Sequence, residues 1–373
     1  MKQDNESDHL IKTSLTIYDI DHFIYLWKRN DGMNNTNHRI TKLQSILIVV
    51  FMIFIVLISF QTLLHAQSTA GKSHQLVETF SIVGRDSVTS ELGVAVASRF
   101  FAVGSVVPWA KADVGAVATQ SFVNTSFGWR GLDLLEQGAT AQQAMDILLK
   151  SDPESQKRQC GIVSANGTSA THTGSECLQW AGGRSGSNYA IQGNILAGEA
   201  VVIAMESAFL NTKGTLAERL YAALLAGDSQ GGDSRGKQSA ALLVVKKNAG
   251  YGGYTDRAID IRVDDNTEPF RELGRLLNYA QMNYSWNEAW TLFMQKEFAK
   301  SLPLMERTAL LGPENAEVLY DLAVIRLAAG KKEASLQAVV KSLRLNPKLK
   351  QQASKDPDLK SLQNDSTFQA MVK

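Results

Sequence analysis

A threonine begins the stretch of this chain with the clearest capacity for chemistry. Residues 79–86 form a short apolar run that ends in turn-forming residues, and residues 91–99 form a second run. Two such runs predict a β-hairpin with Thr79 as its first residue. A threonine hydroxyl becomes a nucleophile when a base takes its proton, and the residue's own α-amine, which titrates at about pH 8, can be that base. The same pattern also fits a surface threonine that starts an ordinary strand.

The histidines and cysteines argue against other common mechanisms. Of the six histidines only His172 follows Thr79, so a serine or cysteine triad has a single candidate imidazole. His172 alternates with small residues on a predicted strand, which indicates a structural or surface histidine. Cys160 and Cys177 are the only cysteines, too few for either common zinc cage. We therefore expect no metal and no cofactor, and a catalytic base other than imidazole.

Polar side chains near glycines are the candidates for substrate binding. Amide side chains both donate and accept hydrogen bonds, which suits recognition of an amide substrate. The amide candidates are Gln120, Asn124, Gln192 and Asn194. Asp233 and Arg235 lie in the glycine-flanked loop 231–236, where backbone can approach a ligand closely. Each of these residues also fits a role in stabilising a turn.

The elements that must position these side chains are short strands and helices. Strands are predicted over residues 114–119, 161–164, 169–173 and 240–246. Helical patterns cover residues 131–136, 141–149, 198–210 and 216–226. Antiparallel strand pairs with helices set between them predict an α+β fold of packed sheets flanked by helices. Glycine marks the end of this domain, because 24 of the 28 glycines lie between Gly71 and Gly253.

Five segments carry a resemblance to a known family. They are LGVAVASRFFAVG (92–104), VPWAKADVGAVATQ (107–120), QGNILAG (192–198), GGDSRGKQSAALL (231–243) and YGGYTDR (251–257). Over residues 79–277, in order and without a large gap, the chain resembles the uncharacterised family known as domain of unknown function 1028. That family resembles the N-terminal nucleophile (Ntn) hydrolases. The resemblance therefore implies a four-layer αββα sandwich and cleavage of an amide bond.

Three catalytic candidates follow. Ntn hydrolases share an amino-terminal threonine, serine or cysteine, and Thr79 lies where the family's domain begins. In the proteasome branch a lysine on a following strand lowers the nucleophile's pKa, and Lys111 follows Thr79 by 32 positions, at about that spacing. Lys111 also fits a solvated lysine at a strand end. Arg99 closes the second strand and could hold an oxyanion or a carboxylate, or form a structural ion pair with Asp113 or Asp233.

The N-terminal part predicts export. Residues 46–60 are apolar and uncharged, with Arg39 and Lys42 just before them. This is typical of a secretory signal with a cut after Ala66, or of an uncleaved membrane anchor. The positive region has ordinary proportions if translation starts at Met33. We expect a periplasmic or extracellular protein, or one anchored to the inner membrane.

A cut after Ala66 would leave residues 67–78 in front of Thr79, with its α-amine in a peptide bond. A second processing step must then remove them. Autoproteolysis by the Thr79 hydroxyl on the Glu78 carbonyl is one route, although Glu78 is bulkier than the glycine common in self-cleaving precursors. Export also permits a disulfide between the two cysteines, with free thiols as the alternative.

The last part of the chain is predicted to be a helical tail. Apolar residues recur at helical spacing through residues 298–309, 319–327 and 336–343. Pro313 and Pro347 lie 34 positions apart, and that period is typical of tetratricopeptide arrays. Barely two repeats fit, fewer than the roughly three that an independent array needs. We expect the tail to pack on the first domain, with a groove that binds a partner peptide or a purely structural role.

These observations divide the chain into residues 1–66 (extension and signal peptide or anchor), 67–78 (linker or propeptide), 79–277 (Ntn-hydrolase-like domain) and 278–373 (tetratricopeptide-like domain). Two functions remain open. One is an exported bacterial amidohydrolase that acts on a small amide, a peptide or a cell-wall fragment. The other is a non-catalytic binding or scaffold protein whose tail engages a protein partner. A homo-oligomer is compatible with both, and the net charge of +1 offers no field for nucleic acid.

Overall fold

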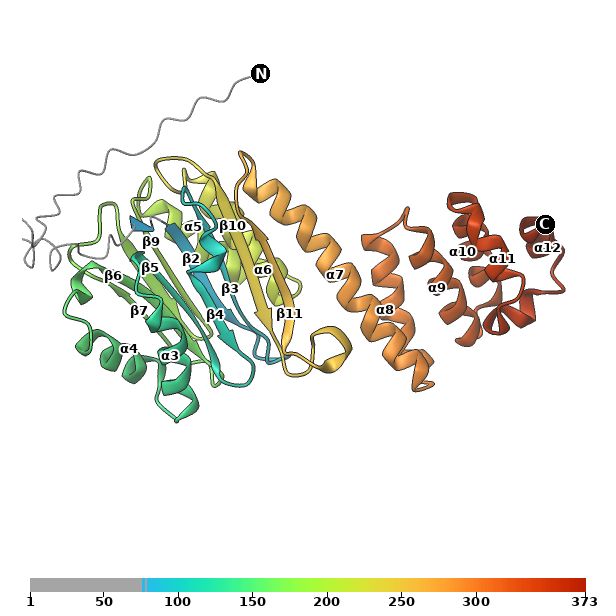
Figure 1. Ribbon diagram of the computed structural model, residues 1–373, viewed down its shortest axis with the longest axis horizontal. Helices are drawn as coiled ribbons and strands as arrows, with labels where there is room; N and C mark the ends of the chain where they lie inside the picture. The colour runs from blue at the N-terminus through green and yellow to red at the C-terminus, as the bar shows by residue number, and fades with distance from the viewer. Residues whose placement is uncertain (1–75, 78) are drawn as a thin grey trace, which may run out of the picture. The chain divides into compact units, whose positions relative to one another are not determined.

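The computed structural model describes residues 76–77 and 79–373 (Figure 1). The predicted signal or anchor segment at residues 46–60 and most of the linker at residues 67–78 therefore lie outside the described residues. Across the part that is described, no helix has both the length and the apolar character that crossing a membrane requires. The described residues form one compact unit.

Two antiparallel sheets form the core of the first part of this unit (Figure 1). The five-stranded sheet has the order β1-β5-β6-β7, with β4 also paired to β5, and its strands are β1 (Leu76–Val77), β4 (Pro108–Lys111), β5 (Gly115–Phe122), β6 (Arg158–Ser164) and β7 (Ser169–Thr173). The six-stranded sheet has the order β11-β10-β3-β2-β9-β8, and its strands are β2 (Thr79–Arg85), β3 (Leu92–Ser98), β8 (Gly182–Gly186), β9 (Tyr189–Asn194), β10 (Ser239–Val245) and β11 (Arg257–Val263).

Small apolar side chains fill most of the layer between the two sheets. Val83, Val94 and Val96 of the six-stranded sheet pack there with Ala116 and Ala118 of the five-stranded sheet. Their neighbours in sequence point to the outer faces, because successive side chains of a strand alternate. Since β2 and β3 lie in the middle of their sheet and are buried on both faces, their sequences are almost continuously apolar.

Helices cover both outer faces. α3 (Ser126–Glu136) and α4 (Ala141–Lys150) pack on the five-stranded sheet, and α5 (Ala200–Asn211) and α6 (Leu216–Ser229) pack on the six-stranded sheet. α4 and α6 each begin with a capping box, in which a threonine and a residue three positions later satisfy each other's backbone N–H. The prediction of a mixed α and β fold with antiparallel sheets is confirmed, and the layers run helix, sheet, sheet, helix.

One long helix, α7 (Pro269–Met294), joins the sandwich to a helical C-terminal region. Its first half packs in the core of the sandwich and its second half in the core of the helical region. The predicted boundary after residue 277 therefore falls inside a continuous helix. The helices that follow are α8 (Phe298–Leu311), α9 (Ala316–Ala328), α10 (Lys332–Leu345), α11 (Lys350–Ala353) and α12 (Ser366–Val372).

The helical region repeats one pattern along the chain. Both ends of α10 are offset from those of α8 by the period that separates the two prolines of the tail. The hydrogen bond from Ser301 Oγ to the carbonyl of Ala289, at 2.7 Å, recurs at the same offset from Ser335 Oγ to the carbonyl of Ala323, at 2.6 Å. The prediction of a helical C-terminal region is confirmed.

Candidate functional site

Thr79 is the first residue of β2, in the middle of the six-stranded sheet. It pairs with Ser98 of β3 on one side and with Asn194 of β9 on the other. Its side chain is completely buried, and Oγ1 donates a hydrogen bond to Ser98 Oγ at 3.3 Å. Upstream, Leu76–Val77 forms β1 and pairs with the end of β5 in the other sheet. The chain therefore passes from one sheet to the other just before Thr79, whose α-amine is part of a peptide bond.

Three buried side chains link the sheets beside Thr79. Ser81 Oγ donates to Gln120 Oε1 at 2.6 Å and accepts from Gln192 Nε2 at 2.6 Å. Gln120 Nε2 in turn donates to the backbone carbonyl of Thr79 at 3.1 Å. Two of the predicted amide residues, Gln120 and Gln192, thus converge on the first residues of β2.

Gln159 of β6 extends this network to Asn194. Its Oε1 accepts from Gln120 Nε2 at 2.8 Å and from Asn194 Nδ2 at 2.9 Å, and its Nε2 donates to the carbonyl of Gly193 at 2.7 Å. Gly161 makes room for the network, because a Cβ atom there would lie 2.1 Å from Oε1 of Gln192. We call Thr79, Ser81, Ser98, Gln120, Gln159, Gln192 and Asn194 the polar cluster.

One buried atom of the polar cluster has no partner. Asn194 is completely buried, and its Oδ1 accepts no hydrogen bond within the described part of the chain. An unsatisfied buried acceptor costs about 1–3 kcal/mol, and native proteins keep few of them. This unfavourable atom belongs to the residue that pairs with Thr79. Packing alone therefore does not explain why polar residues occupy this end of the layer.

The loop at residues 231–236 closes over the same end of the six-stranded sheet. Asp233 is buried and accepts from the backbone N–H of Arg99 at 2.9 Å and from Arg235 Nη2 at 2.8 Å. The exposed guanidinium of Arg99 donates instead to Gln238 Oε1 at 2.7 Å. The structure thus brings Arg99, Asp233 and Arg235 to the end of the sheet where Thr79 begins β2, with both guanidinium groups at the surface.

Lys111 lies away from the polar cluster. It ends β4 opposite Gly115, whereas Gln120, which contacts Thr79, lies five residues further along β5. At about 3.4 Å per residue the two positions are about 17 Å apart. Lys111 Nζ forms an exposed ion pair with Glu136 at 2.6 Å. The expected approach of Lys111 to Thr79 is therefore not seen, because the hairpin from β4 to β5 turns at the far end of the layer.

Asn124 stabilises the turn after β5 through its side-chain hydrogen bonds. Its Nδ2 donates to Asp152 Oδ2 at 2.8 Å, an atom that also accepts from Arg158 Nε at 2.9 Å. Burial alone would raise the pKa of Asp152, but hydrogen bonds from Arg158 and Asn124 outweigh it and lower the pKa from 3.8 to about 2. The contacts of Asn124 are those of the turn-stabilising alternative.

The remaining chemically reactive groups lie outside the polar cluster. Cys160 and Cys177 are buried free thiols, so the disulfide alternative is not realised. Burial raises the pKa of Cys160 to about 12, which keeps the thiol protonated and unreactive. His172 Nε2 lies 3.1 Å from the carbonyl of Ser155, as a structural histidine would. Within the described ranges, no group of three or more His, Cys, Asp or Glu side chains could hold a metal ion.

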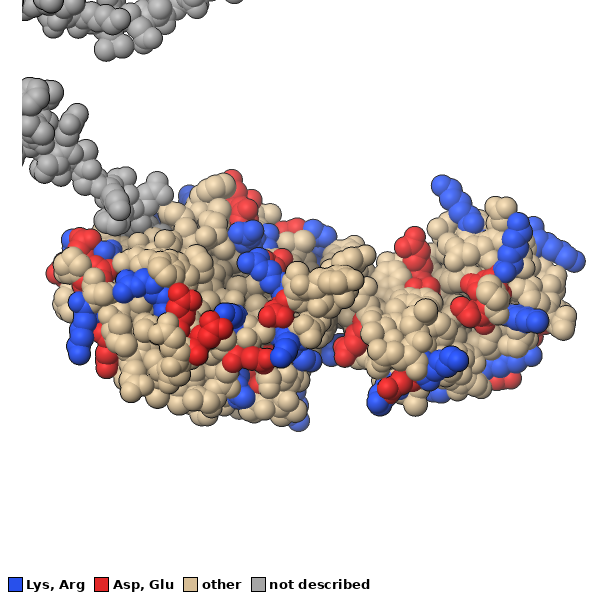
Figure 2. Space-filling model, turned by 60° about the horizontal axis from the view of Figure 1, so that its bottom comes forward, with Lys and Arg blue, Asp and Glu red and all other residues tan. Residues whose placement is uncertain are grey.

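Charged residues of both signs are scattered over one face of the sandwich. Figure 2 shows Lys and Arg interspersed with Asp and Glu on the face in view, so that face carries no field of one sign. The sequence analysis missed Ser81, Ser98 and Gln159. Ser81 follows Thr79 by two positions and therefore shares its face of β2, a signal that strand periodicity provides. Gln159 offered only a weaker signal, an amide two positions before a strand glycine.

The fold and this site define a two-sheet α and β domain with a buried polar cluster at one end. The chain belongs to the family of unknown function DUF1028, which matches residues 79–273 and thus begins at Thr79. The resemblance to this family is confirmed.

A solved structure of the same family supports the assignment. The crystal structure of protein SPO2555 from Silicibacter pomeroyi, described as a DUF1028 protein, is 28% identical to this chain. The similarity covers 55% of this chain and 89% of that chain, with a TM-score of 0.50. No curated protein matches the chain.

Proposed function

We propose that this chain is the precursor of an exported amidohydrolase of the Ntn type, in which the hydroxyl of Thr79 is the nucleophile. The observation that carries the proposal is the polar cluster: hydroxyl and amide side chains from both sheets are buried around the first residue of a central strand. A layer that served packing alone would be filled by apolar side chains, as the rest of it is. The four layers of the sandwich are those expected of an Ntn fold.

The first step in this proposal is removal of the residues before Thr79. Attack of Thr79 Oγ1 on the Glu78 carbonyl forms an ester and transfers the chain from nitrogen to oxygen, which frees the α-amine. Water then hydrolyses the ester, releases the upstream peptide and returns the proton to Oγ1. The same step detaches β1, which lies on the end of β5 beside the polar cluster, and gives substrate access to a hydroxyl that is completely buried in the precursor.

The mature site would then act on an amide. The free α-amine takes the proton of Oγ1, Oγ1 bonds to the substrate carbonyl carbon, and the proton passes to the leaving nitrogen as the C–N bond breaks. Water hydrolyses the resulting ester. Arg99 or backbone N–H groups near Gly193 would stabilise the oxyanion, a role usually worth about 3–4 kcal/mol per donor. Asn194 lies opposite Thr79 in the ladder and its Oδ1 has no partner, so on this proposal Oδ1 accepts a hydrogen bond from the new amine. Lys111 has no part in this mechanism.

The substrate class follows from the chemistry of the site. Amide side chains and two guanidinium groups suit a small amide, a peptide or a cell-wall fragment that carries a carboxylate. The apolar segment at residues 46–60 supports delivery of this activity to the periplasm or the outside of the cell.

A second function, binding without catalysis, is favoured by different observations. Thr79 is buried and its amine is in a peptide bond, so the precursor has no accessible nucleophile. The repeated geometry of α8 and α10 supports a tetratricopeptide-like tail, a kind of structure that binds peptides in its groove. On this proposal the tail engages a protein partner and the sandwich is a scaffold.

N-terminal sequencing of the mature protein from its native host separates the two functions. A mature chain that starts at Thr79 supports the amidohydrolase, and one that starts at Gln67 favours the binding protein. A matched pair of shortened chains, in which a single initiator methionine precedes Thr79 or Thr79→Ala, should then be tested on a panel of amides and acyl peptides. Hydrolysis that depends on Thr79 is the result expected of the enzyme.

A further inference from the structure

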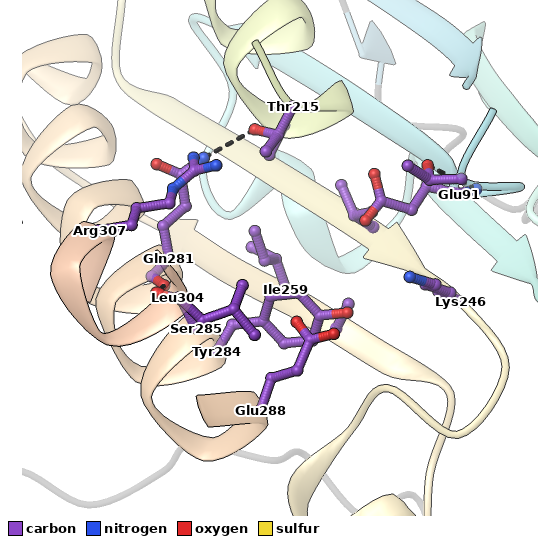
Figure 3. A pocket seen from close by; sticks show the side chains of 14 residues that line it. Glu91, Thr215, Lys246, Ile259, Gln281, Tyr284, Ser285, Glu288, Leu304 and Arg307 are labelled. Atoms are coloured by element: carbon purple, nitrogen blue, oxygen red, sulfur yellow. Dashed lines mark hydrogen bonds between the residues drawn. The ribbon is translucent and has the colours of Figure 1, made fainter. Parts of the chain in front are cut away.

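A cavity of about 180 Å³ lies between the sandwich and the helical region, at the opposite end of β2 and β3 from Thr79 (Figure 3). Its floor is apolar and comes from β10, β11 and the first turn of α6. Its other walls come from the loop before β3 and from α7 and α8. The apolar lining consists of Ala217, Val244, Ala258, Ile259 and Leu304. The polar lining includes Glu91, Lys246, Gln281, Tyr284, Glu288 and Arg307.

Two of the polar residues hold the walls together. Gln281 Nε2 of α7 donates to Thr215 Oγ1 at the start of α6, at 2.8 Å. Arg307 Nη2 of α8 donates to Glu218 Oε1 of α6, at 3.1 Å. These bonds tie helices α7 and α8 to the sandwich, so the cavity is bounded by fixed contacts.

Four other polar groups face the cavity, and of these Glu91 accepts hydrogen bonds from Thr89 and from the backbone of Leu216. Figure 3 shows Glu91 and Lys246 across the cavity from Tyr284 and Glu288. In the described part of the chain, the side chain of Lys246 forms no hydrogen bond and no ion pair, although two carboxylates line the same cavity. The side chains of Tyr284 and Glu288 likewise form no hydrogen bond within residues 79–373. The charge of Lys246 acts on Glu91 and lowers its pKa, but the two side chains form no ion pair, so the charged groups surround the space without direct contact.

Burial shifts the pKa of two of these groups. It raises the pKa of the Glu91 carboxyl, although a hydrogen bond from Thr89, the charge of Lys246 and a hydrogen bond from the backbone of Leu216 oppose this. Burial, with the carboxylates of Glu288 and Glu91, raises the pKa of Tyr284 to about 12. The phenol is therefore a hydrogen-bond donor beside two carboxylates at neutral pH.

The arrangement selects a ligand with both charges. A molecule with only an ammonium group would leave Lys246 unmatched, and one with only a carboxylate would face Glu91 and Glu288. A zwitterion matches both sets, with its ammonium toward the carboxylates and its carboxylate toward Lys246. The volume equals that of about six water molecules, at roughly 30 Å³ each. The apolar floor fits a short aliphatic side chain.

We propose that this cavity is a binding site for a small free amino acid, held by its ammonium group at Glu91 and Glu288 and by its carboxylate at Lys246. The wider groove that shares Lys246, Tyr284 and Glu288 and runs under the loop before β11 is its entrance. Because the walls come from both the sandwich and the helical region, the ligand ties these two parts together. This proposal does not depend on the reaction proposed for Thr79.

Isothermal titration calorimetry on the full chain tests the site with glycine, L-alanine, L-valine and L-leucine as probes. At least one should bind with a millimolar or lower dissociation constant. N-acetyl-L-valine, which lacks the ammonium charge, and L-valinamide, which lacks the carboxylate, should bind at least tenfold more weakly than L-valine. Failure of all four amino acids to bind would overturn the proposal.

Variants locate the binding. Glu91→Gln and Lys246→Met should each weaken binding at least tenfold, whereas the same substitutions at the exposed positions Glu333 and Lys348 should leave it unchanged. Ala258→Leu fills the floor of the cavity without touching a charge and should also abolish binding. If Glu91→Gln unfolds the chain, Lys246→Met and Ala258→Leu still test whether the ligand binds in this cavity. Binding that survives both of these would place the ligand elsewhere and contradict the assignment.

Discussion

The layer between the two sheets has two ends that differ in chemistry. At one end Val83, Val94, Ala116 and Ala118 pack as any sandwich core does. At the other end, the same strands carry the hydroxyls and amides of the polar cluster, which are equally buried. Both ends are built by the same two-residue alternation along β2, β3 and β5.

The two ends therefore contribute differently to the stability of the fold. Apolar burial contributes about 25 cal/mol per Å² and needs no directional partner. Buried amides offset their desolvation only through a complete network, and here Asn194 Oδ1 is left unsatisfied. The apolar end therefore accounts for stability, and the polar end is the place to seek function.

The largest expected effect is on turnover. Once an amide substrate is found, Thr79→Ala should lower its turnover by about 10³-fold or more, because no other hydroxyl would carry the α-amine that activates it. Thr79→Ser should retain part of the activity. Steady-state kinetics check this, with the exposed Thr367→Ala as a control that keeps parental rates. Parental turnover by Thr79→Ala would leave the binding function as the better account.

The apolar end should respond most strongly in stability. Leu92→Ala removes a completely buried side chain from the layer and should lower the free energy of unfolding by about 2–5 kcal/mol. Turnover per folded molecule should not change. Urea denaturation followed by circular dichroism measures the loss. A change below about 1 kcal/mol would mean that the two ends do not differ as described.

The polar end should lose less stability when one of its amides is removed. Gln120→Met keeps the volume but leaves the Ser81 hydroxyl hydrogen without an acceptor and the Thr79 carbonyl without its side-chain donor, whereas Gln159 Oε1 still accepts from Asn194. At about 1–3 kcal/mol per orphaned group, the expected loss is about 2 kcal/mol. The exposed Gln142→Met is the matched control. A stabilised Gln120→Met chain would show that the network costs more than it contributes.

A fall in pH should remove a smaller contribution to stability, the one that comes from the hydrogen bonds between Asp152 and its partners Asn124 and Arg158. The pKa of Asp152 is about 2 in the folded chain and 3.8 without its partners, so its contribution is complete above about pH 4 and is lost as pH falls through about 2. This contribution is about 2 kcal/mol. Asn124→Ala should reduce it, because that amide lowers the pKa. The measurement is the free energy of unfolding of both chains between about pH 5 and pH 2. If the Asn124→Ala chain lost as much stability over this range as the parent, the prediction would be wrong.

The smallest effect is expected at Lys111. Its ion pair with Glu136 is about half exposed, and such pairs contribute about 0–1 kcal/mol. Because Lys111 lies at the apolar end, Lys111→Met should not change turnover. A rate loss comparable to that of Thr79→Ala would contradict this and would show that the lysine acts together with Thr79.

Local sequence patterns were sufficient to predict most of the strands and helices of the sandwich and to identify the family. The predicted strands correspond to β5, β6, β7 and β10 and the predicted helices to α3, α4, α5 and α6, because period and turn residues are properties of short segments. The five quoted segments identified the family that matches from Thr79 onward.

The composition of the site required the tertiary structure. The structure brings the candidates Gln120, Gln192, Asn194, Arg99 and Asp233 to one end of the sheets. Their partners Ser81, Ser98 and Gln159 were not among the candidates, and Lys111 lies at the other end of the layer. The 32 positions between Thr79 and Lys111 give only the length of chain that separates them. Whether the two side chains lie close together depends on where the intervening hairpins turn.

The amino-acid sequence by itself determined which segments are strands and helices, where Thr79 begins the family's domain, and that the last part of the chain is helical. Only the tertiary structure decided that α7 runs through the predicted boundary, that Thr79 is buried, and that a cavity lies between α7 and β11. Those features arise from side chains far apart in the sequence. Their contacts depend on strand register and on the packing of layers, which no local pattern records.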